Sequence, residues 1–407
     1  MPSRLNPDLG HLTARMRAAR PSLSRSRGGS KRAPAGATVI GLDIDPGHVV
    51  AAEVSINGGL SVRRAAAATL APGVVRDGEV IEVDALSETL RTLFAENKLG
   101  RRVRLGLANQ RIMVRTMELP HLPDRGDFAA AVRFGAQDEI PMPLDSVVLD
   151  FHSLGIVETP GGPRERVLLV AARRDMVDRL LAAVNAAGLR AEGVDLSAFA
   201  LIRALLPPGA DPSERVLYLS VGGLTNLALA EGQKCLFTRI LGGGLETMAA
   251  AVAERCVMPV LEARTLLRDT GLTDSGGPAD AAEVSCAAPD ASEARAAPEA
   301  IATAENVLAP STLIARQVLS DGVRQIATEV RNSLDYHLAL GPGSSVGRVV
   351  AAGTALEIPG FRDTLESEIG LPVTLGEVAE SSPGAAGGLP LSRLAVATGL
   401  AVAEVAP

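Results

Sequence analysis

The sequence predicts an α/β protein made of two similar halves that face each other across a cleft. Each half begins with a hydrophobic strand, a turn of small residues and a second strand. The first such hairpin occupies 38–54, and the second occupies 217–230, roughly 180 residues later. Because glycine has no side chain, backbone N–H groups in two facing turns of this kind can approach an anion such as a phosphate.

Composition favours a multidomain cytoplasmic protein. At 407 residues the chain exceeds one ordinary hydrophobic core, so we expect at least two domains. It is 47% hydrophobic but has no Trp, 2 Tyr and 7 Phe, which predicts a core of Ala, Val and Leu. Cys235, Cys256 and Cys286 lack disulfide or zinc spacing and favour a reducing compartment. No apolar run approaches the roughly 18 residues of a transmembrane helix, and the N-terminal stretch lacks the apolar segment of a secretory signal.

The first 37 residues are strongly basic. They hold eight Arg or Lys and one acid, Asp8, for a net charge of +7, whereas the whole chain carries −7. A segment rich in Arg, Ser, Gly and Pro buries too little surface to fold, so we predict a disordered tail over 1–37. Such a tail is either simply solvated or in contact with anionic lipid at the inner membrane face. The acidic body offers no basic groove and few aromatics, which argues against nucleic-acid binding.

In the first half, β-branched runs predict strands and amphipathic periodicity predicts helices. We expect strands at 38–44, 49–54, 60–66, 103–107 and 112–117, and a helix at 85–98. After Pro120 the pattern changes to helices at 128–139 and 175–187 with strands at 147–153, 166–172 and 189–196. This alternation predicts a compact α+β subdomain inserted into the first half.

The second half repeats the first in outline. After the hairpin strands, the Gly242-Gly243-Gly244 run precedes a helix at 245–255, and a further helix follows Pro259. The Ala- and Pro-rich stretch 272–310 predicts a disordered insert. We expect a long helix at 313–340, a strand at 346–352, and helices at 358–368 and 391–402.

Domain boundaries follow from these elements. The first domain takes 38–116 and 190–210, the inserted subdomain takes 117–189, and the second domain takes 211–271 and 311–407.

Several short motifs, taken in their order along the chain, resemble those of the actin, Hsp70 and sugar-kinase superfamily. The stretch 220–226 is similar to its second phosphate loop, and 350–360 is similar to its adenosine loop. More narrowly, the chain resembles the PilM family of type IV pilus assembly proteins, an FtsA-like branch. The motifs that carry this resemblance are Met117-Glu118-Leu119-Pro120, 137–141, 237–244 and 329–336, and it extends over about 38–402.

The resemblance implies an actin-like, ribonuclease H-like fold: duplicated domains flanking a nucleotide cleft, with an FtsA-type inserted α+β subdomain. It also implies a cytoplasmic scaffold that lies peripherally at the inner membrane. The implied partner is the N-terminal tail of a PilN-like inner-membrane protein, held in a groove beside the inserted subdomain, because a small α+β domain can take an extended apolar peptide. Pilus motor ATPases are further candidate partners. Membrane association would then come through these partners and the basic tail.

A nucleotide site for ATP and Mg²⁺ is implied as well. Asp43 is the candidate metal contact, and a turn residue that caps its own hairpin is the alternative interpretation of this carboxylate. No residue is assigned a catalytic role. The candidate cofactor-binding residues are Asp43, Asp45, Gly47, Ser220, Gly222, Gly223, Thr225, Gly243, Glu329, Ser333, Gly353 and Thr354.

Four positions depart from the superfamily pattern. Asp45 and Ser220 stand where the two phosphate loops usually have Gly and Asp, Thr354 replaces a Gly of the adenosine loop, and Asn332 replaces a basic residue. Asp45 would face the negative charge of a triphosphate, although a carboxylate could also hold Mg²⁺. Ser220 is a poor base, and losing one well-placed group can cost about 10²–10³ in rate. We therefore expect a degenerate nucleotide site and a scaffold function.

Two alternatives stay open at this point. One is an ATP-binding or ATP-hydrolysing member of the superfamily, including a weak ATPase. The other is an FtsA-like filament former, although the final residues 401–407 contain no basic amphipathic segment. A dinucleotide-dependent oxidoreductase is disfavoured because no Gly-x-Gly-x-x-Gly motif follows the first strand.

Overall fold

The computed structural model describes residues 39–56, 59–273, 309–339 and 346–402. Within these ranges the two larger sheets share the order of five strands, read in opposite directions along the sheet, and the first has β16 as an additional edge strand. The first sheet runs β10-β6-β1-β2-β3-β16 and the second runs β13-β12-β11-β14-β15. In each sheet three consecutive antiparallel strands are followed by parallel strands on the far side of the first strand. The predicted duplication is therefore confirmed at the level of topology.

The strands of the first sheet are β1 (Ile40–Asp45), β2 (His48–Ser55), β3 (Ser61–Thr69), β6 (Arg102–Leu107), β10 (Arg190–Leu196) and β16 (Ala379–Glu380). Those of the second sheet are β11 (Arg215–Val221), β12 (Thr225–Glu231), β13 (Lys234–Leu241), β14 (Arg348–Ala352) and β15 (Val373–Leu375). In the two opening hairpins, Asp45 pairs with His48, and Val221 pairs with Thr225. These registers place both turns at the corresponding end of their sheets.

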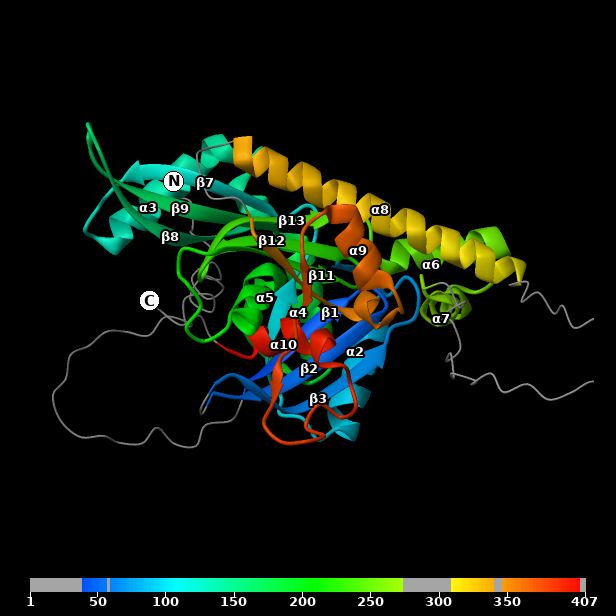
Figure 1. Cartoon of the computed structure of the whole chain (residues 1–407). Coiled ribbons are helices and arrows are strands. Elements are labelled where there is room, and N and C mark those ends of the chain that lie inside the picture. Colours follow the sequence, from blue (N-terminus) through cyan, green and yellow to red (C-terminus); the bar gives the residue numbers. More distant parts are fainter. Residues whose placement is uncertain (1–38, 57–58, 274–308, 340–345, 403–407) are drawn as a thin grey trace, which may run out of the picture.

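Two helices, α5 (Ser197–Leu205) and α10 (Ala395–Leu400), lie between the sheets (Figure 1). Their side chains share one buried core with residues of both sheets, including Val50, Tyr218 and Val350. Neighbouring parts of the two helices pack tightly, because a Cβ added to Gly399 would overlap the carbonyl oxygen of Ala200. This central layer joins the two domains.

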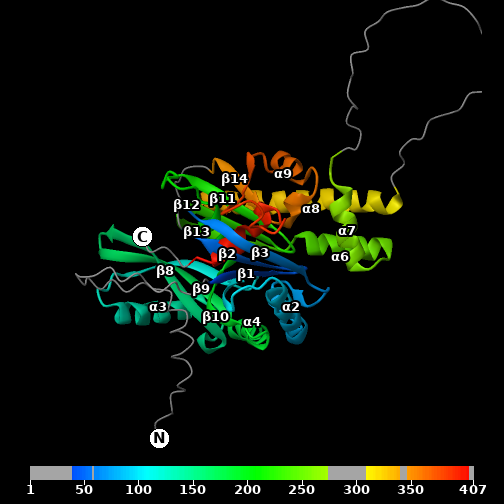
Figure 2. The same cartoon turned by 90° about the horizontal axis from the view of Figure 1, so that it is seen from below.

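The outer faces of the sheets carry separate helical layers. On the first sheet, α2 (Val83–Glu96) and α4 (Arg174–Ala186) bury residues such as Leu90 and Leu180. On the second sheet lie α6 (Leu245–Cys256), α7 (Val260–Thr270), α8 (Pro310–Ala339) and α9 (Phe361–Ile369). Figure 2 shows the two layers on opposite sides of the sheets, with α8 and α9 away from α2 and α4.

A third sheet projects from the first domain (Figure 1). It consists of β7 (Met113–Pro120), β9 (Gly162–Arg173) and β8 (Val147–Thr159) in that order, and α3 (Arg125–Glu139) packs on it around Phe128 and Val132. The carboxylate of Asp124 caps α3 by accepting from the N–H groups of Gly126 and Asp127 at 2.8 and 2.9 Å. An α+β insertion is therefore present, and its sheet begins at Met113. We call this sheet and α3 the inserted subdomain.

The second helix that the sequence places in the insertion, α4, packs differently. Its apolar side joins the core of the first domain beside α2, because Met176, Val177 and Leu180 share a cluster with Leu90. Another difference is α5, which the sequence analysis did not predict. Six of its nine residues are buried between the two sheets, and periodicity alone does not distinguish so short and apolar a stretch from a buried strand.

Shorter elements complete the described chain: β4 (Val75–Arg76), β5 (Glu79–Val80) and the 3-10 turns η1 (Leu144–Ser146), η2 (Thr354–Glu357) and η3 (Leu391–Leu394). The expected last helix at 391–402 thus starts as a 3-10 turn, and the expected helix at 358–368 starts at Phe361. The predicted basic tail at 1–37 and nearly all of the predicted insert at 272–310 lie outside the described residues.

Candidate functional site

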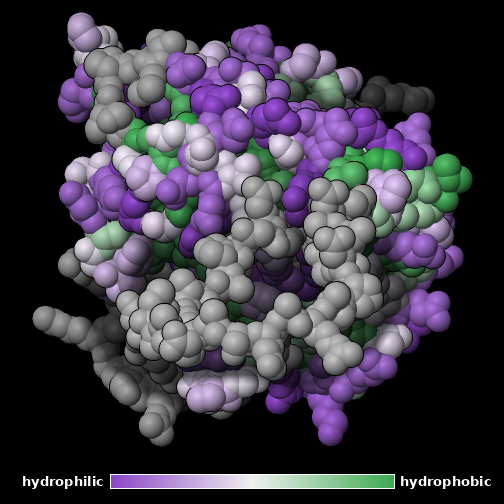
Figure 3. Space-filling view, turned by 45° about the vertical axis from the view of Figure 1, so that its right-hand side comes forward, coloured by the Kyte–Doolittle hydropathy of each residue, from purple (hydrophilic) through white to green (hydrophobic). Residues whose placement is uncertain are grey.

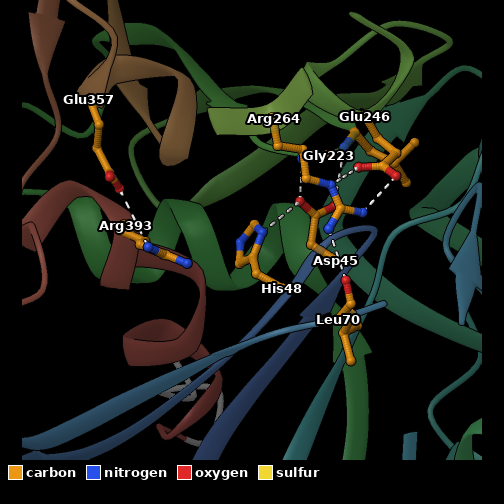
Figure 4. Close-up of polar contacts among 9 residues, drawn as sticks. Asp45, His48, Leu70, Gly223, Glu246, Arg264, Glu357 and Arg393 are labelled. Atoms are coloured by element: carbon orange, nitrogen blue, oxygen red, sulfur yellow. Dashed lines mark hydrogen bonds and ion pairs between the residues drawn. The ribbon is translucent and has the colours of Figure 1, made fainter. Parts of the chain in front are cut away.

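The two hairpin turns meet directly across the domain interface. The carboxylate of Asp45, at the end of β1, accepts hydrogen bonds from the backbone N–H groups of Gly223 and Leu224, the latter at 3.2 Å (Figure 4). Within the second turn, the N–H of Gly222 donates to the carbonyl of Leu224 at 2.8 Å. The N–H groups of Gly223 and Leu224, which face the first domain, therefore already have a hydrogen-bond acceptor in the side chain of Asp45.

Glycines allow this close approach. A Cβ on Gly223 would overlap the carbonyl oxygen of Pro46, and a Cβ on Gly222 would overlap the Asp45 carboxylate. Gly47 has a φ of +96°, which favours glycine, and a Cβ there would lie 3.2 Å from Oε2 of Glu246. The sequence analysis expected these glycines to make room for a phosphate; in the structure they make room for the opposite turn.

A second interdomain contact lies beside the turns. Arg264 of α7 forms a two-pronged ion pair with Glu246 of α6, with N–O distances of 2.9 and 2.7 Å. Its remaining terminal nitrogen, Nη1, donates to the carbonyl of Leu70 in the first domain at 2.8 Å (Figure 4). The pair is mostly buried, with 14% of the Arg264 side chain exposed. Arg264 thus links the second domain to the first.

Burial shifts the pKa values of three groups near the turns. Burial raises the pKa of Asp43 to about 7. Burial, with the neighbouring carboxylates of Asp43 and Glu246, also raises the pKa of Asp45, although the N–H groups of the second turn oppose that shift. The pKa of His48, whose Nδ1 lies 3.7 Å from Asp45, falls to about 3 because of burial and the charges of Arg393 and Arg264. His48 is therefore neutral at physiological pH.

Other polar groups surround this cluster. Arg393 of η3 lies 3.8 Å from Glu357 of η2, on the side of His48 away from Arg264 (Figure 4). On β12, Oγ1 of Thr225 and both polar side-chain atoms of Asn226 are buried and have no hydrogen-bond partner among the described residues. The interface is therefore polar but only partly satisfied within the chain.

The structure divides the sequence-predicted site residues between two places. Those at or next to the meeting turns are Asp43, Asp45, Gly47, Ser220, Gly222, Gly223, Thr225, Gly353 and Thr354. Gly353 joins this group because a Cβ there would lie 2.5 Å from the carbonyl oxygen of Val221. The remaining candidates lie along β13 and α8: Glu329 pairs with Arg239 at 3.3 Å, and Ser333 accepts from Arg239 at 3.4 Å.

A cavity of about 460 Å³ lies along this second group, and we call it the β7–β13 groove. Its walls come from the start of the inserted subdomain, the first domain, β13 and α8. Its lining residues include Met113, Val114, Arg115, Thr238, Arg239, Ile240, Gly243, Gln325 and Glu329. Gly243 and Glu329, two of the predicted nucleotide contacts, therefore face the groove.

The sequence analysis missed Arg264, Glu246, Arg393 and Glu357. Arg264 and Glu246 are 18 residues apart on separate helices, and no local spacing connects them. His48 stood in the predicted turn, but its contact with the second turn, where a Cβ on Gly222 would lie 3.6 Å from Cε1 of His48, joins segments far apart in the sequence. Among the described residues, no group of three or more His, Cys, Asp or Glu is arranged to hold a metal ion.

The surface offers a further apolar area. Figure 3 shows hydrophobic side chains gathered toward the right edge of a mainly hydrophilic face. Exposed apolar residues near α6 and α7 include Val257, which is 92% exposed, and Leu261. Figure 1 places α6 and α7 at the opposite end of the molecule from β7. Among the described helices, none combines the length and hydrophobicity needed to cross a membrane.

Two domains of equal topology, joined by a central helical layer and carrying facing hairpin turns, define an actin-like protein with an inserted α+β subdomain. Comparison with known proteins agrees with this class. The model of a family described as type IV pilus assembly protein PilM matches residues 41–274, more than half of the chain. The chain belongs to this family.

Solved structures are similar over nearly the whole length. A chain of a "PilM-PilN type IV pilus biogenesis complex" is 25% identical with a TM-score of 0.69, and the match covers 91% of this chain and 99% of that one. The ethanolamine utilization protein EutJ from Carboxydothermus hydrogenoformans is 14% identical with a TM-score of 0.50, over 97% of both chains. The second likeness concerns the fold alone.

Proposed function

We propose that this protein is a scaffold of a type IV pilus assembly machine that binds the N-terminal tail of a PilN-like inner-membrane protein in the β7–β13 groove. The observation that carries the proposal is the likeness to a chain of a PilM–PilN complex over 91% of this chain, together with membership of the PilM family. The family favours this function over an ATPase or a filament former.

Strand order supports the choice of groove. β7 is an edge strand of the three-stranded sheet, and β13 is an edge strand of the second sheet. Both contribute to the groove wall, through 113–115 and 238–243. An edge strand presents unpaired backbone N–H and C=O groups, which an extended peptide can pair with. The groove therefore suits an extended tail better than a helix.

Side chains of the groove offer both apolar and charged contacts. Met113, Val114 and Ile240 supply apolar surface, while Arg115 adds an exposed positive charge. Arg239 and Glu329 already pair with each other at 3.3 Å, so each is held in place before a peptide arrives. A tail with apolar residues at alternate positions and an acidic group matches this lining.

Co-purification tests the proposal. The protein, tagged and expressed with a PilN-like membrane protein from the same genome, should retain that partner, and removal of the partner's short cytoplasmic tail should release it. Retention of the tailless partner would contradict binding through the tail.

A point variant tests the groove itself. Ile240→Glu places a charge in the apolar lining and should weaken tail binding by about tenfold or more, because a buried anchor carries much of the binding free energy. Ile156→Glu is the matched control: Ile156 lies on β8, the other edge of the same three-stranded sheet as β7, and is 54% exposed. Equal binding by the two variants would place the tail elsewhere.

Localisation and further partners belong to the same proposal. The scaffold lies in the cytoplasm and reaches the inner membrane through its PilN-like partner, with the basic 1–37 tail as a second contact. Pilus motor ATPases are its candidate cytoplasmic partners, so that the scaffold couples the membrane platform to the motor. Fractionation of cells with and without the PilN-like protein would show whether membrane association depends on the partner.

A further inference from the structure

We propose that Asp45 is an internal ligand of the second hairpin turn, and that its carboxylate closes the interdomain cleft where the fold class would otherwise admit the phosphates of a nucleotide. The starting observation is the pair of N–H donors, Gly223 and Leu224, that point at one carboxylate from the other domain. Consecutive backbone N–H groups in a glycine turn form a concave site for an anion. In this protein, the anion is a side chain.

The geometry leaves no space for a second anion between the turns. A Cβ on Gly223 would already overlap the carbonyl oxygen of Pro46, and one on Gly222 would overlap Asp45 itself. Gly47, on the other side of the first turn, lies against Glu246 and Arg264. A phosphate chain is much larger than a methyl group, so the turns would have to separate before it entered.

The charges near the two turns also disfavour binding of a polyphosphate. The carboxylates of Asp43 and Glu246 lie close enough to Asp45 to raise its pKa, and they would also repel a polyphosphate. Arg264 is held by Glu246 and by the Leu70 carbonyl, so its positive charge is already engaged. Arg393 lies near Glu357, and His48 is neutral because its pKa is lowered to about 3. Among the described residues, the cation engaged beside the two turns is Arg264, whereas Arg393, whose buried Nε has no hydrogen-bond partner, lies on the side of His48 away from Arg264 (Figure 4).

Two bridges then hold the domains together without a nucleotide. Asp45 joins β1 to the β11–β12 turn, and Arg264 joins α7 to the end of β3. A scaffold that depends on a fixed arrangement of its two domains gains from contacts that are present at any nucleotide concentration. A cleft that is closed by the protein's own side chains therefore fits a scaffold that binds its partner whether or not nucleotide is present.

The decisive experiment measures nucleotide binding by the full-length protein. Titration calorimetry with Mg²⁺-ATP, Mg²⁺-ADP and pyrophosphate should give no saturable binding to the wild type up to about 1 mM ligand. Asp45→Gly removes the internal ligand and frees the two N–H groups, so it should gain binding at least about tenfold tighter than any residual wild-type signal. Asp45→Asn is the matched control, since its side-chain oxygen still fills the turn and should prevent that gain.

Each result has a definite meaning. Saturable nucleotide binding by the wild type at micromolar concentrations would overturn the proposal. Failure of both Asp45→Gly and Asp45→Ser, each shown by circular dichroism to be folded, to gain nucleotide or pyrophosphate binding would also overturn it. A second measurement needs no nucleotide: amide hydrogen exchange of peptides that span 220–227 should be faster in Asp45→Gly than in wild type, and unchanged exchange would refute the bridge.

Discussion

A guanidinium N–H of Arg264 donates to the backbone carbonyl of Leu70, with 2.8 Å between Nη1 and the oxygen. Arg264 belongs to the second domain and Leu70 follows β3 of the first, so one side chain spans the interface. Its orientation is fixed by the two-pronged pair with Glu246. Planar guanidinium groups suit this role because they donate in several directions from one rigid plane.

Removal of this side chain should destabilise the protein. In Arg264→Ala the mostly buried Glu246 carboxylate and the Leu70 carbonyl lose their donors, which should lower the free energy of unfolding by about 2 kcal/mol. Urea unfolding followed by circular dichroism measures the change. Arg324→Ala is the control, because its pair with Asp321 is more than half exposed and should contribute less than about 1 kcal/mol. Similar losses of unfolding free energy in both variants would show that Arg264 contributes no more to stability than an exposed ion pair does.

The central helical layer depends on glycine at close approaches. Gly399→Ala would overlap the Ala200 carbonyl, and Gly41→Ala would overlap that of Ala397. We expect each variant to lose about 3 kcal/mol or more, or to be recovered as insoluble protein, because backbone on both sides must shift. The control is Gly347→Ala, which has open space around its Cβ and should stay within about 0.5 kcal/mol of wild type. Thermal unfolding of the soluble fractions makes the comparison, and a stable Gly399→Ala would contradict the tight packing of α5 on α10.

The elements that could be predicted are those whose residues show a local pattern of hydrophobicity or turn-forming residues. Continuous hydrophobic runs and glycine turns predicted the opening hairpins, in which Leu42 pairs with Ala51 and Leu217 with Leu229. The amphipathic face of α2, with Leu86 and Leu90 on the core side, was likewise visible in the sequence. Such patterns record which side of an element is buried, and so they predict the element and its core face.

The unpredicted part depends on contacts between distant segments. Helix α5 is short and mostly apolar because six of its nine residues are buried between the two sheets, and its sequence alone does not distinguish a buried helix from a buried strand. The role of Asp45 is also non-local: the sequence marks it as an unusual residue in a turn, but its hydrogen bonds come from a turn 178 residues away. Glu329 and Ser333 contact Arg239 and not the meeting turns. Their position depends on how distant segments pack, and no local sequence pattern indicates it.

The hydroxyl of Tyr218 provides a test of a buried polar atom. This side chain is 1% exposed, and its hydroxyl finds no hydrogen-bond partner among the described residues. Burial accordingly raises its pKa to about 12. Tyr218→Phe removes the hydroxyl and leaves the ring, so the free energy of unfolding should stay unchanged or rise by up to about 1 kcal/mol. A loss of more than about 1 kcal/mol in urea unfolding would indicate that the hydroxyl is bonded, for example to a water molecule.

Asp43 should make stability depend on pH. Its pKa is raised from an ordinary value of 3.8 to about 7 in the folded protein, so between these values the folded chain binds more protons than the unfolded chain. Stability from this group is therefore complete below about pH 4 and is lost as the pH rises through 7. His48 acts oppositely, because its pKa is lowered to about 3 and its contribution is lost as the pH falls below 6.5.

The variant Asp43→Asn isolates the carboxylate, since His48 is present in both proteins. At pH 8 it should be more stable than wild type by about 2 kcal/mol or more, because burial makes the ionised carboxylate unfavourable by about 1.4 kcal/mol for each unit by which the pKa is raised. At pH 5 the two proteins should differ less than at pH 8, because the wild-type carboxyl is then protonated in the folded state and only its ionisation in the unfolded chain still lowers stability. Asp138→Asn, at an exposed position on α3, is the control and should change stability by less than about 0.5 kcal/mol at both pH values. Urea unfolding at pH 5 and pH 8 gives the four differences, and an Asp43→Asn effect that is the same at both would show that Asp43 is ionised throughout.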